Sequence, residues 1–184
     1  MHISRKLFHA SGLVIVVLWT WLDVPRVTMA VILTAIALGS ALVDVWRHRS
    51  PALQARFEKA FGRILDEKDL SGLNGTTLYF LGCALAAWIT SVPAAKAGIV
   101  ALAVGDSLAA IIGSSVRSPR WGRISVAGTG ACFVAATLGA RVWFAWPPAL
   151  AAGAAAAVLE AFSGSKLDNL SIPVGAALVL EYWP

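Results

Sequence analysis

The stretch AAKAGIVALAVGDSLAAIIGSSV, residues 94–116, decides the class of fold, because it is a long apolar run that holds a carboxylate, Asp106. A charged side chain at bilayer depth costs about 2.5–3.5 kcal/mol on insertion scales, so chains keep one there for chemistry or ion handling. The rest of the chain is similarly apolar, since 58% of its 184 residues are hydrophobic and 14% are charged. This composition is typical of an integral membrane protein and excludes an ordinary soluble domain.

Apolar segments recur along the chain and predict an all-α, polytopic membrane bundle of about seven transmembrane helices, with residues 1–184 as a single domain. The predicted segments are Leu7–Val24, Val27–Val43, Leu73–Val92, Ala97–Val116, Val126–Trp146, Ala149–Phe162 and Leu170–Trp183. The last two have about 14 residues, or about 21 Å of helix against a hydrocarbon core of about 30 Å, which leaves open whether they cross fully. We expect a multi-pass protein of the inner membrane or of another cellular membrane.

The distribution of Lys and Arg predicts the orientation of this bundle. The amino terminus and alternate connections hold most of the 15 cations, whereas Arg26, Lys96 and Arg141 fall on the opposite side. By the positive-inside rule, the amino terminus is cytoplasmic and the carboxyl terminus lies outside. The net charge of +5 is therefore a signal of topology, and we expect no nucleic-acid partner.

The longest polar connection, Val45–Gly72, predicts an amphipathic helix between the second and third spans. Ser50-Pro51 is typical of a helix start, and Leu53, Phe57, Phe61, Ile64 and Leu65 recur at helical spacing opposite basic residues. Such a helix is expected to lie on the cytoplasmic membrane surface, where anionic lipid attracts its cations.

Acidic residues and a helix start meet on the predicted cytoplasmic side. The acids and their polar neighbour are Asp44, Asp106, Glu160, Asp168 and Asn169. The same side carries Arg117, Arg120 and Arg123, followed by Ser125, Gly128 and Thr129 at the start of a helix. Backbone N–H groups and the dipole at a helix start favour phosphate oxygens. Together these groups indicate a nucleotide phosphate that Mg²⁺ bridges to carboxylates, although topology alone also explains the arginines.

Four stretches resemble the family of dolichol kinases, phytol kinases and CTP-dependent diacylglycerol kinases. They are RKLFHASG at 5–12, GDSLAAIIG at 105–113, RISVAGTGACF at 123–133, and Glu160 followed by LDNLSIPVG at 167–175. The resemblance covers nearly the whole chain. It implies a polytopic membrane kinase that transfers the γ-phosphate of CTP to the hydroxyl of a lipid alcohol, with Mg²⁺, at a cytoplasm-facing site.

On this interpretation the candidate site residues fall into three sets. The catalytic and metal-binding candidates are Asp106, Glu160 and Asp168, with the base among them left open. The nucleotide-binding candidates are Lys6, Gly105, Ser107, Arg123, Ser125, Gly128, Thr129 and Asn169. The acceptor-site candidates are His9, Asp44, Asn74 and Thr76, and the acceptor is a polyprenol or dolichol, phytol or diacylglycerol.

The chain departs from the family pattern before the fifth predicted span. Many members have a lysine and a glutamate where this sequence reads Ile124-Ser125-Val126-Ala127-Gly128-Thr129. Arg123 is the nearest substitute for the missing positive charge, so the family's nucleotide contacts in this stretch are not carried over to this chain.

Two other functions fit parts of the pattern. A CDP-lipid synthase also needs CTP and Mg²⁺ beside carboxylates, but it releases pyrophosphate where a kinase releases CDP. A small cation or proton transporter would use Asp106 and the short final spans as a route across the membrane. The oligomeric state and the identity of the lipid tail stay open.

Overall fold

The computed structural model describes residues 9–184 except residues 11, 63–71, 123 and 165, and it is all-α, as the sequence predicts. The helices are α2 (Leu13–Trp21), α3 (Arg26–Arg49), α4 (Pro51–Phe61), α6 (Gly75–Ile89), α7 (Val92–Val100), η1 (Ala101–Asp106), α8 (Ser107–Ser115), α9 (Val126–Ala140), α10 (Trp146–Phe162) and α11 (Asp168–Glu181). Two short strands, β1 (Arg120–Trp121) and β2 (Ile124–Ser125), pair antiparallel between α8 and α9.

Each predicted apolar segment contains a helix, but several helix ends differ from the prediction. Helix α3 continues past Val43 to Arg49, so Asp44 and Arg47 belong to the same helix. Helix α6 ends at Ile89, and the next helix begins at Val92 because Pro93 fits the first turn of a helix. Pro147 and Pro148 similarly occupy the first turn of α10, which begins at Trp146.

Two helices of the described part are long and apolar enough to cross a membrane. They are α3 and the continuous helix Val92–Ser115, which comprises α7, η1 and α8. Helices α6, α9 and α10 are apolar but shorter. Together with the relatives described below, these helices suggest a membrane protein, whereas the number of spans and their orientation stay predictions.

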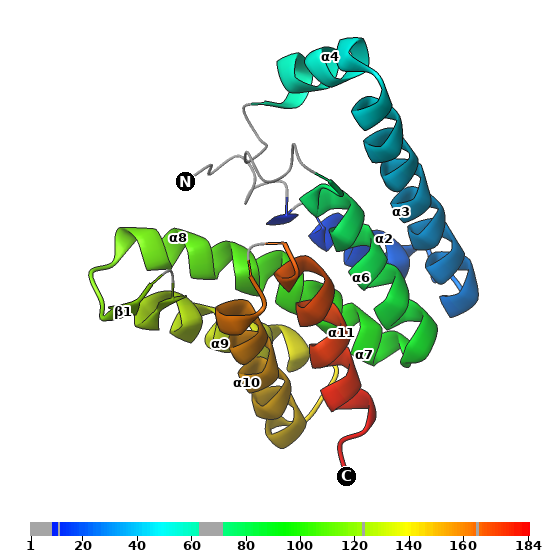
Figure 1. Ribbon diagram of the computed structural model, residues 1–184. Coiled ribbons are helices and arrows are strands. Elements are labelled where there is room, and N and C mark those ends of the chain that lie inside the picture. Colours follow the sequence, from blue (N-terminus) through cyan, green and yellow to red (C-terminus); the bar gives the residue numbers. More distant parts are fainter. Residues whose placement is uncertain (1–8, 11, 63–71, 123, 165) are drawn as a thin grey trace.

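The predicted helix after Ser50 is confirmed as α4, which runs from Pro51 to Phe61. The Ser50 hydroxyl accepts a hydrogen bond from the backbone N–H of Leu53 at 3.4 Å, which caps the helix as the sequence indicates. Ile64 and Leu65 lie outside the described residues. Figure 1 shows α4 at an angle to α3, beyond the end of the bundle. Its position on a membrane surface remains a prediction.

Small residues bring the helices around Val92–Ser115 into close contact. A Cβ atom on Gly98 would lie 2.3 Å from the carbonyl oxygen of Pro173 in α11, and one on Gly128 would lie 2.6 Å from that of Ala109 in α8. Figure 1 shows α8 and α9 side by side, with the β hairpin at their outer end. Helix packing by close backbone approach is typical of membrane bundles, where glycine and alanine replace bulkier side chains at the contact.

The helix Val92–Ser115 widens into a π-helical turn, η1, over residues Ala101–Asp106. Gly105 therefore does not break the helix, and Asp106 stands at the end of the widened turn. π-helical turns within α-helices occur frequently at functional sites. This local irregularity singles out the segment that carries the buried carboxylate.

Candidate functional site

Asp106 is buried and paired with His9. Its Oδ2 lies 3.1 Å from Nδ1 of His9, and the two residues are 3% and 4% exposed. The Tyr79 ring packs on the imidazole with centroids 5.3 Å apart, and its hydroxyl donates a hydrogen bond to the His9 carbonyl at 3.4 Å. The structure thus brings together two predicted site residues that are far apart in the sequence. A histidine in this position orients the carboxylate that it contacts.

Asp168 and Asn169 lie at the start of α11 and are both buried. The backbone N–H of Asn169 donates a hydrogen bond to Oδ1 of Asp168 at 2.8 Å. A carboxylate in the first turn is also stabilised by the helix dipole. The Asn169 amide nitrogen donates to the Gly75 carbonyl at 3.1 Å, whereas its buried Oδ1 has no hydrogen-bond partner among the residues that the structure describes. An oxygen of this kind is available to a donor or cation that enters the site.

The start of α11 is tied to the start of α6 at a second point. The Lys166 ammonium donates a hydrogen bond to the Leu73 carbonyl at 3.1 Å. Together with the bond from Asn169 to Gly75, this contact holds residues on both sides of Asp168 against the turn that precedes α6. The position of Asp168 therefore depends on the position of residues 73–75.

The start of α6 is in turn held by Asp44, which accepts four hydrogen bonds. The donors are Arg47 Nε at 2.9 Å, the Asn74 backbone N–H at 2.9 Å, Asn74 Nδ2 at 3.1 Å and Thr77 Oγ1 at 2.8 Å. Asn74 also caps α6, since its Oδ1 accepts from the Thr77 N–H at 2.9 Å. Asp44 and Asn74 thus act structurally here, and their contact with an acceptor lipid stays a prediction, as it does for the half-buried Thr76.

Arg47 completes this network and was not singled out as a site residue from the sequence. Its guanidinium pairs with Asp44 and donates to the Gln54 side chain at 3.0 Å and to the Gly72 carbonyl at 2.9 Å. It is 2% exposed, so its charge is compensated within the protein. The spacing of Asp44 and Arg47 on one helix face is the signal that could have identified the pair. Tyr79, which packs on His9, had no comparable signal.

The predicted phosphate site at the start of α9 is capped from within the chain. Ser125 Oγ accepts a hydrogen bond from the Gly128 N–H at 3.3 Å, and Ser118 Oγ accepts one from the Ala127 N–H at 3.2 Å. Gly128 also packs against α8. A nucleotide at this helix start would have to compete with these contacts, and the assignment of Ser125 and Gly128 to nucleotide binding stays a prediction.

Thr129 and Glu160 face each other between α9 and α10. The Thr129 hydroxyl donates to the Glu160 carboxylate at 3.4 Å, and both residues are half-buried. In the Val92–Ser115 helix, Ser107 Oγ donates to the Ala103 carbonyl at 2.7 Å, and a Cβ on Gly105 would lie 3.2 Å from Cys132 Sγ. Ser107 and Gly105 thus have local roles in helix bonding and helix contact beside their predicted nucleotide roles.

The described residues contain no group of three or more His, Cys, Asp or Glu side chains that could hold a metal ion. Asp106, Glu160 and Asp168 are therefore not gathered into a three-carboxylate cluster among those residues. Mg²⁺ is usually held by only one or two carboxylates together with substrate phosphates. Lys6 and Arg123, the predicted cationic contacts of the nucleotide, lie outside the described residues.

Comparison with known proteins supports a lipid kinase. The chain is 29% identical to a phytol kinase of Synechocystis sp., over 96% of this chain and 77% of the relative. It is 31% identical to dolichol kinase EVAN of Arabidopsis thaliana over 76% of this chain, which corresponds to 28% of that longer protein. It is also 27% identical to an uncharacterized protein of Rickettsia prowazekii, over 98% of this chain and 94% of the relative. No family model and no solved structure matches the chain.

Proposed function

We propose that this protein is a membrane lipid kinase that transfers the γ-phosphate of CTP to the hydroxyl of a lipid alcohol. The observation that carries the proposal is the similarity to a phytol kinase over 96% of the chain, which includes the segment of the buried His9–Asp106 pair. CTP as donor follows from the resemblance of the sequence motifs. Phytol or a polyprenol is the acceptor class that the names of the relatives favour.

The arrangement of the helices suits a substrate with a long apolar tail and a polar end. Buried polar groups gather where the starts of α6 and α11 meet, while α6 and the neighbouring helices α9 and α10 are apolar. A lipid alcohol can keep its tail in the bilayer and bring its hydroxyl to this polar end. A soluble nucleotide would approach the same end from the cytoplasm, which agrees with the predicted orientation.

We assign Mg²⁺ to carboxylate and amide oxygens, because these are the ligands that the ion prefers in proteins. Asp106 and Asp168 would hold the ion, and Oδ1 of Asn169, which has no hydrogen-bond partner among the described residues, would offer a further hard oxygen ligand. When bound, Mg²⁺ neutralises charge on the donor phosphates and helps to orient them. Glu160, with its Thr129 contact, is the third candidate ligand or the base.

In the proposed reaction the alcohol oxygen forms a bond to the γ-phosphorus, and the bond from that phosphorus to the bridging oxygen breaks to release CDP. The alcohol proton passes to a base of the protein, which we assign to Glu160 or to His9 with Asp106 behind it. Phosphoryl transfer depends mainly on alignment and charge neutralisation. The protein therefore contributes chiefly by holding Asp106 through His9 and Asp168 through the turn before α6.

The deciding experiment incubates purified protein in detergent with γ-labelled CTP, Mg²⁺ and a panel of phytol, polyprenol and diacylglycerol. We expect label in an organic-phase lipid and CDP as the second product. A parallel reaction with phosphatidate supplies the phosphate acceptor that a CDP-lipid synthase needs. Labelled pyrophosphate with unlabelled lipid in that reaction would instead identify a synthase. If neither CTP nor ATP yields a labelled lipid, the kinase proposal is wrong.

A further inference from the structure

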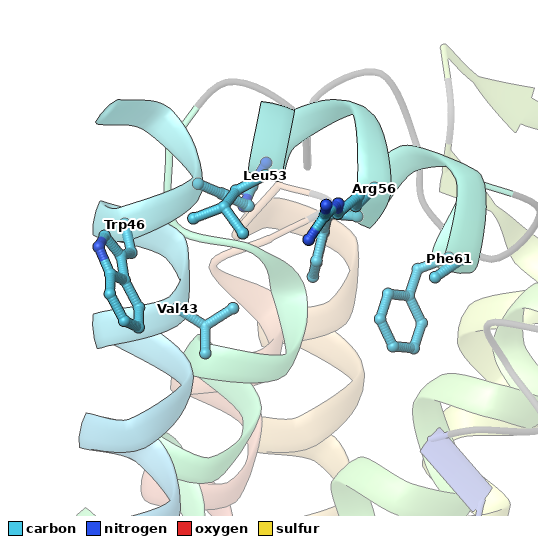
Figure 2. Close-up of a pocket in the computed structure, with 8 residues that line it drawn as sticks. Val43, Trp46, Leu53, Arg56 and Phe61 are labelled. Carbon is cyan, nitrogen blue, oxygen red and sulfur yellow. The ribbon is translucent and has the colours of Figure 1, made fainter. Parts of the chain in front are cut away.

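The end of α3 and the facing side of α4 border an open hollow of about 320 Å³ that the kinase chemistry does not use. Figure 2 shows Val43 and Trp46 of α3 on one side of it and Leu53, Arg56 and Phe61 of α4 on the other. Its volume falls in the range of about 300–1,000 Å³ that is typical of small-molecule sites. Apart from Arg47 and Arg56, the lining side chains are apolar, so hydrocarbon is the chemistry that fits it.

The hollow opens onto an apolar face of α3. Leu38 and Leu42 are 60% and 68% exposed and lead along the helix to Val43 and Trp46, which are also exposed. An exposed apolar face of this length marks contact with lipid or with another protein. Since α3 is a candidate membrane span, a lipid chain that lies along this face can reach the hollow without leaving an apolar surface.

Among the residues that the structure describes, the surroundings of the hollow carry an excess of positive charge. Arg47 is neutralised by Asp44, and its guanidinium packs over the Phe57 ring at 4.7 Å, which fixes one wall. Arg56 at the rim and Arg49 and Lys59 nearby are exposed, and the part of the chain that the structure describes contains no carboxylate in an ion pair with them. Glu58, the acid of α4, accepts a hydrogen bond from Gln54. This excess of positive charge favours an anionic ligand over a neutral or zwitterionic one.

We propose that this hollow binds an anionic phospholipid, with part of one acyl chain against Val43, Trp46 and Phe57 and the phosphate against Arg56. The hollow adjoins the acceptor-site candidate Asp44 through Arg47, and the binding of a phospholipid there goes beyond the proposed kinase activity. Its bound lipid packs on Arg47, which also holds Asp44 and thereby the start of α6. Lipid in the hollow would therefore stabilise the packing of α4 on α3, next to the start of α6.

Native mass spectrometry of the full chain in detergent tests the site without any activity assay. The protein is mixed with phosphatidylglycerol or with phosphatidylcholine of matched chains, and retained lipid is measured. We expect selective retention of phosphatidylglycerol and about fivefold weaker binding after Arg56→Gln, because one surface cation contributes about 1 kcal/mol. Lys59→Gln is the matched control, since it removes the same charge from the same helix without lining the hollow. An equal loss of phosphatidylglycerol binding in the two variants would indicate that the lipid is attracted to the overall charge of α4 and not to the hollow, which would overturn the proposal.

A second variant tests the hollow itself. Ala60 lines it and is exposed, so Ala60→Trp fills the space without entering the core. We expect this variant to unfold at the same temperature in lipid-free detergent and to retain no phosphatidylglycerol. The proposal is wrong if Ala60→Trp binds phosphatidylglycerol as well as the parent protein does. It is also wrong if phytol displaces phosphatidylglycerol equally well from the parent protein and from Arg56→Gln. A lipid-free dimer that Ala60→Trp dissociates would also overturn it.

Discussion

The two candidate membrane spans, α3 and the helix Val92–Ser115, have the same length of 24 residues but different surroundings. In their most apolar windows, 28% of α3 is buried inside the protein, against 61% of Val92–Ser115. Helix α3 is peripheral and packs mainly on α6 and α4, whereas Val92–Ser115 contacts α6, α9, α10 and α11. Similar hydropathy has thus produced one helix at the edge of the bundle and one at its centre.

The residue types explain this difference. The central helix is rich in alanine and glycine, and Gly98, Gly105 and Gly113 meet neighbouring helices at close range. The outer positions of α3 carry branched or bulky residues such as Val31, Ile32 and Leu38, which are exposed. In a bilayer, apolar area alone does not drive helices together, so small residues that permit close packing select the central helix.

Each of the two helices also carries one buried acid, and the acids differ in their partners. Asp44 of α3 accepts hydrogen bonds from Arg47, Asn74 and Thr77. Asp106 follows a π-helical turn and pairs with a histidine. Asp44 is thus a structural acid of the peripheral helix, whereas the functional role of Asp106 on the central helix is part of the proposed function.

The largest effect is expected for Asp106→Asn, which keeps the size of the side chain and removes its charge. Turnover in the labelled-CTP assay should fall on the order of a hundredfold or more, because a carboxylate beside the transferring phosphate is lost. The far-UV circular dichroism and the unfolding temperature should stay close to those of the parent. Undiminished turnover would show that Asp106, like Asp44, acts structurally.

For Asp44→Asn the pattern should be reversed, with a loss of stability as the primary effect. Removing one partner of a buried ion pair costs about 3–5 kcal/mol, because Arg47 remains charged and uncompensated. Thermal unfolding in detergent measures this loss. The double variant Asp44→Asn with Arg47→Met should recover part of it. A stable Asp44→Asn protein without kinase activity would instead favour the predicted contact between Asp44 and the acceptor.

Truncating a leucine on each helix compares central with peripheral packing. Leu102 is fully buried in η1, so Leu102→Ala should lower the free energy of unfolding by about 2–5 kcal/mol through the cavity that it leaves. Leu38 lies on the exposed face of α3, where detergent or lipid replaces the lost atoms, so Leu38→Ala should change stability by less than about 0.5 kcal/mol. Equal losses would show that another chain covers the α3 face.

Adding one methyl group to each helix should give a smaller contrast than truncating a leucine. Gly98→Ala places a Cβ 2.3 Å from the Pro173 carbonyl oxygen, and overpacking of this kind costs about 1–3 kcal/mol. Gly39→Ala on α3 meets no atom within 4 Å and should be neutral or slightly stabilising. Unfolding temperatures of both variants in the same detergent provide the comparison. A tolerated Gly98→Ala would mean that α7 and α11 separate without cost.

Much of the local structure followed from the sequence, because each feature depends on neighbouring residues. The apolar runs predicted the helices, and Ser50-Pro51 predicted the start of α4. Asn74 was predicted as an acceptor-site residue, and its role as the cap of α6 was seen only in the structure. The helix ends were less predictable. Asp44 was expected just beyond a span, yet α3 continues to Arg49 because the Asp44–Arg47 pair is satisfied inside the protein.

The sequence predicted which residues belong to the candidate site, but it predicted only some of the contacts between them. Asp106, Asp168 and Asn169 were identified because polar groups in apolar helices cost free energy and are usually kept for a function. Their partners come from distant parts of the chain: His9 for Asp106, and Gly75 for the Asn169 amide. No local pattern encodes these contacts, since they require the helices to be packed.

Periodicity, composition and motifs are local properties, so the order of the amino acids was enough to predict the helical class, the polar groups that interrupt it and the resemblance to lipid kinases. The packed helices were needed to show which of two similar apolar helices is central, and which partners each buried acid has. It also revealed the hollow between α3 and α4. The physical reason is that packing depends on distant small residues that fit together, and the free energy of a buried charge depends on the partners that packing supplies.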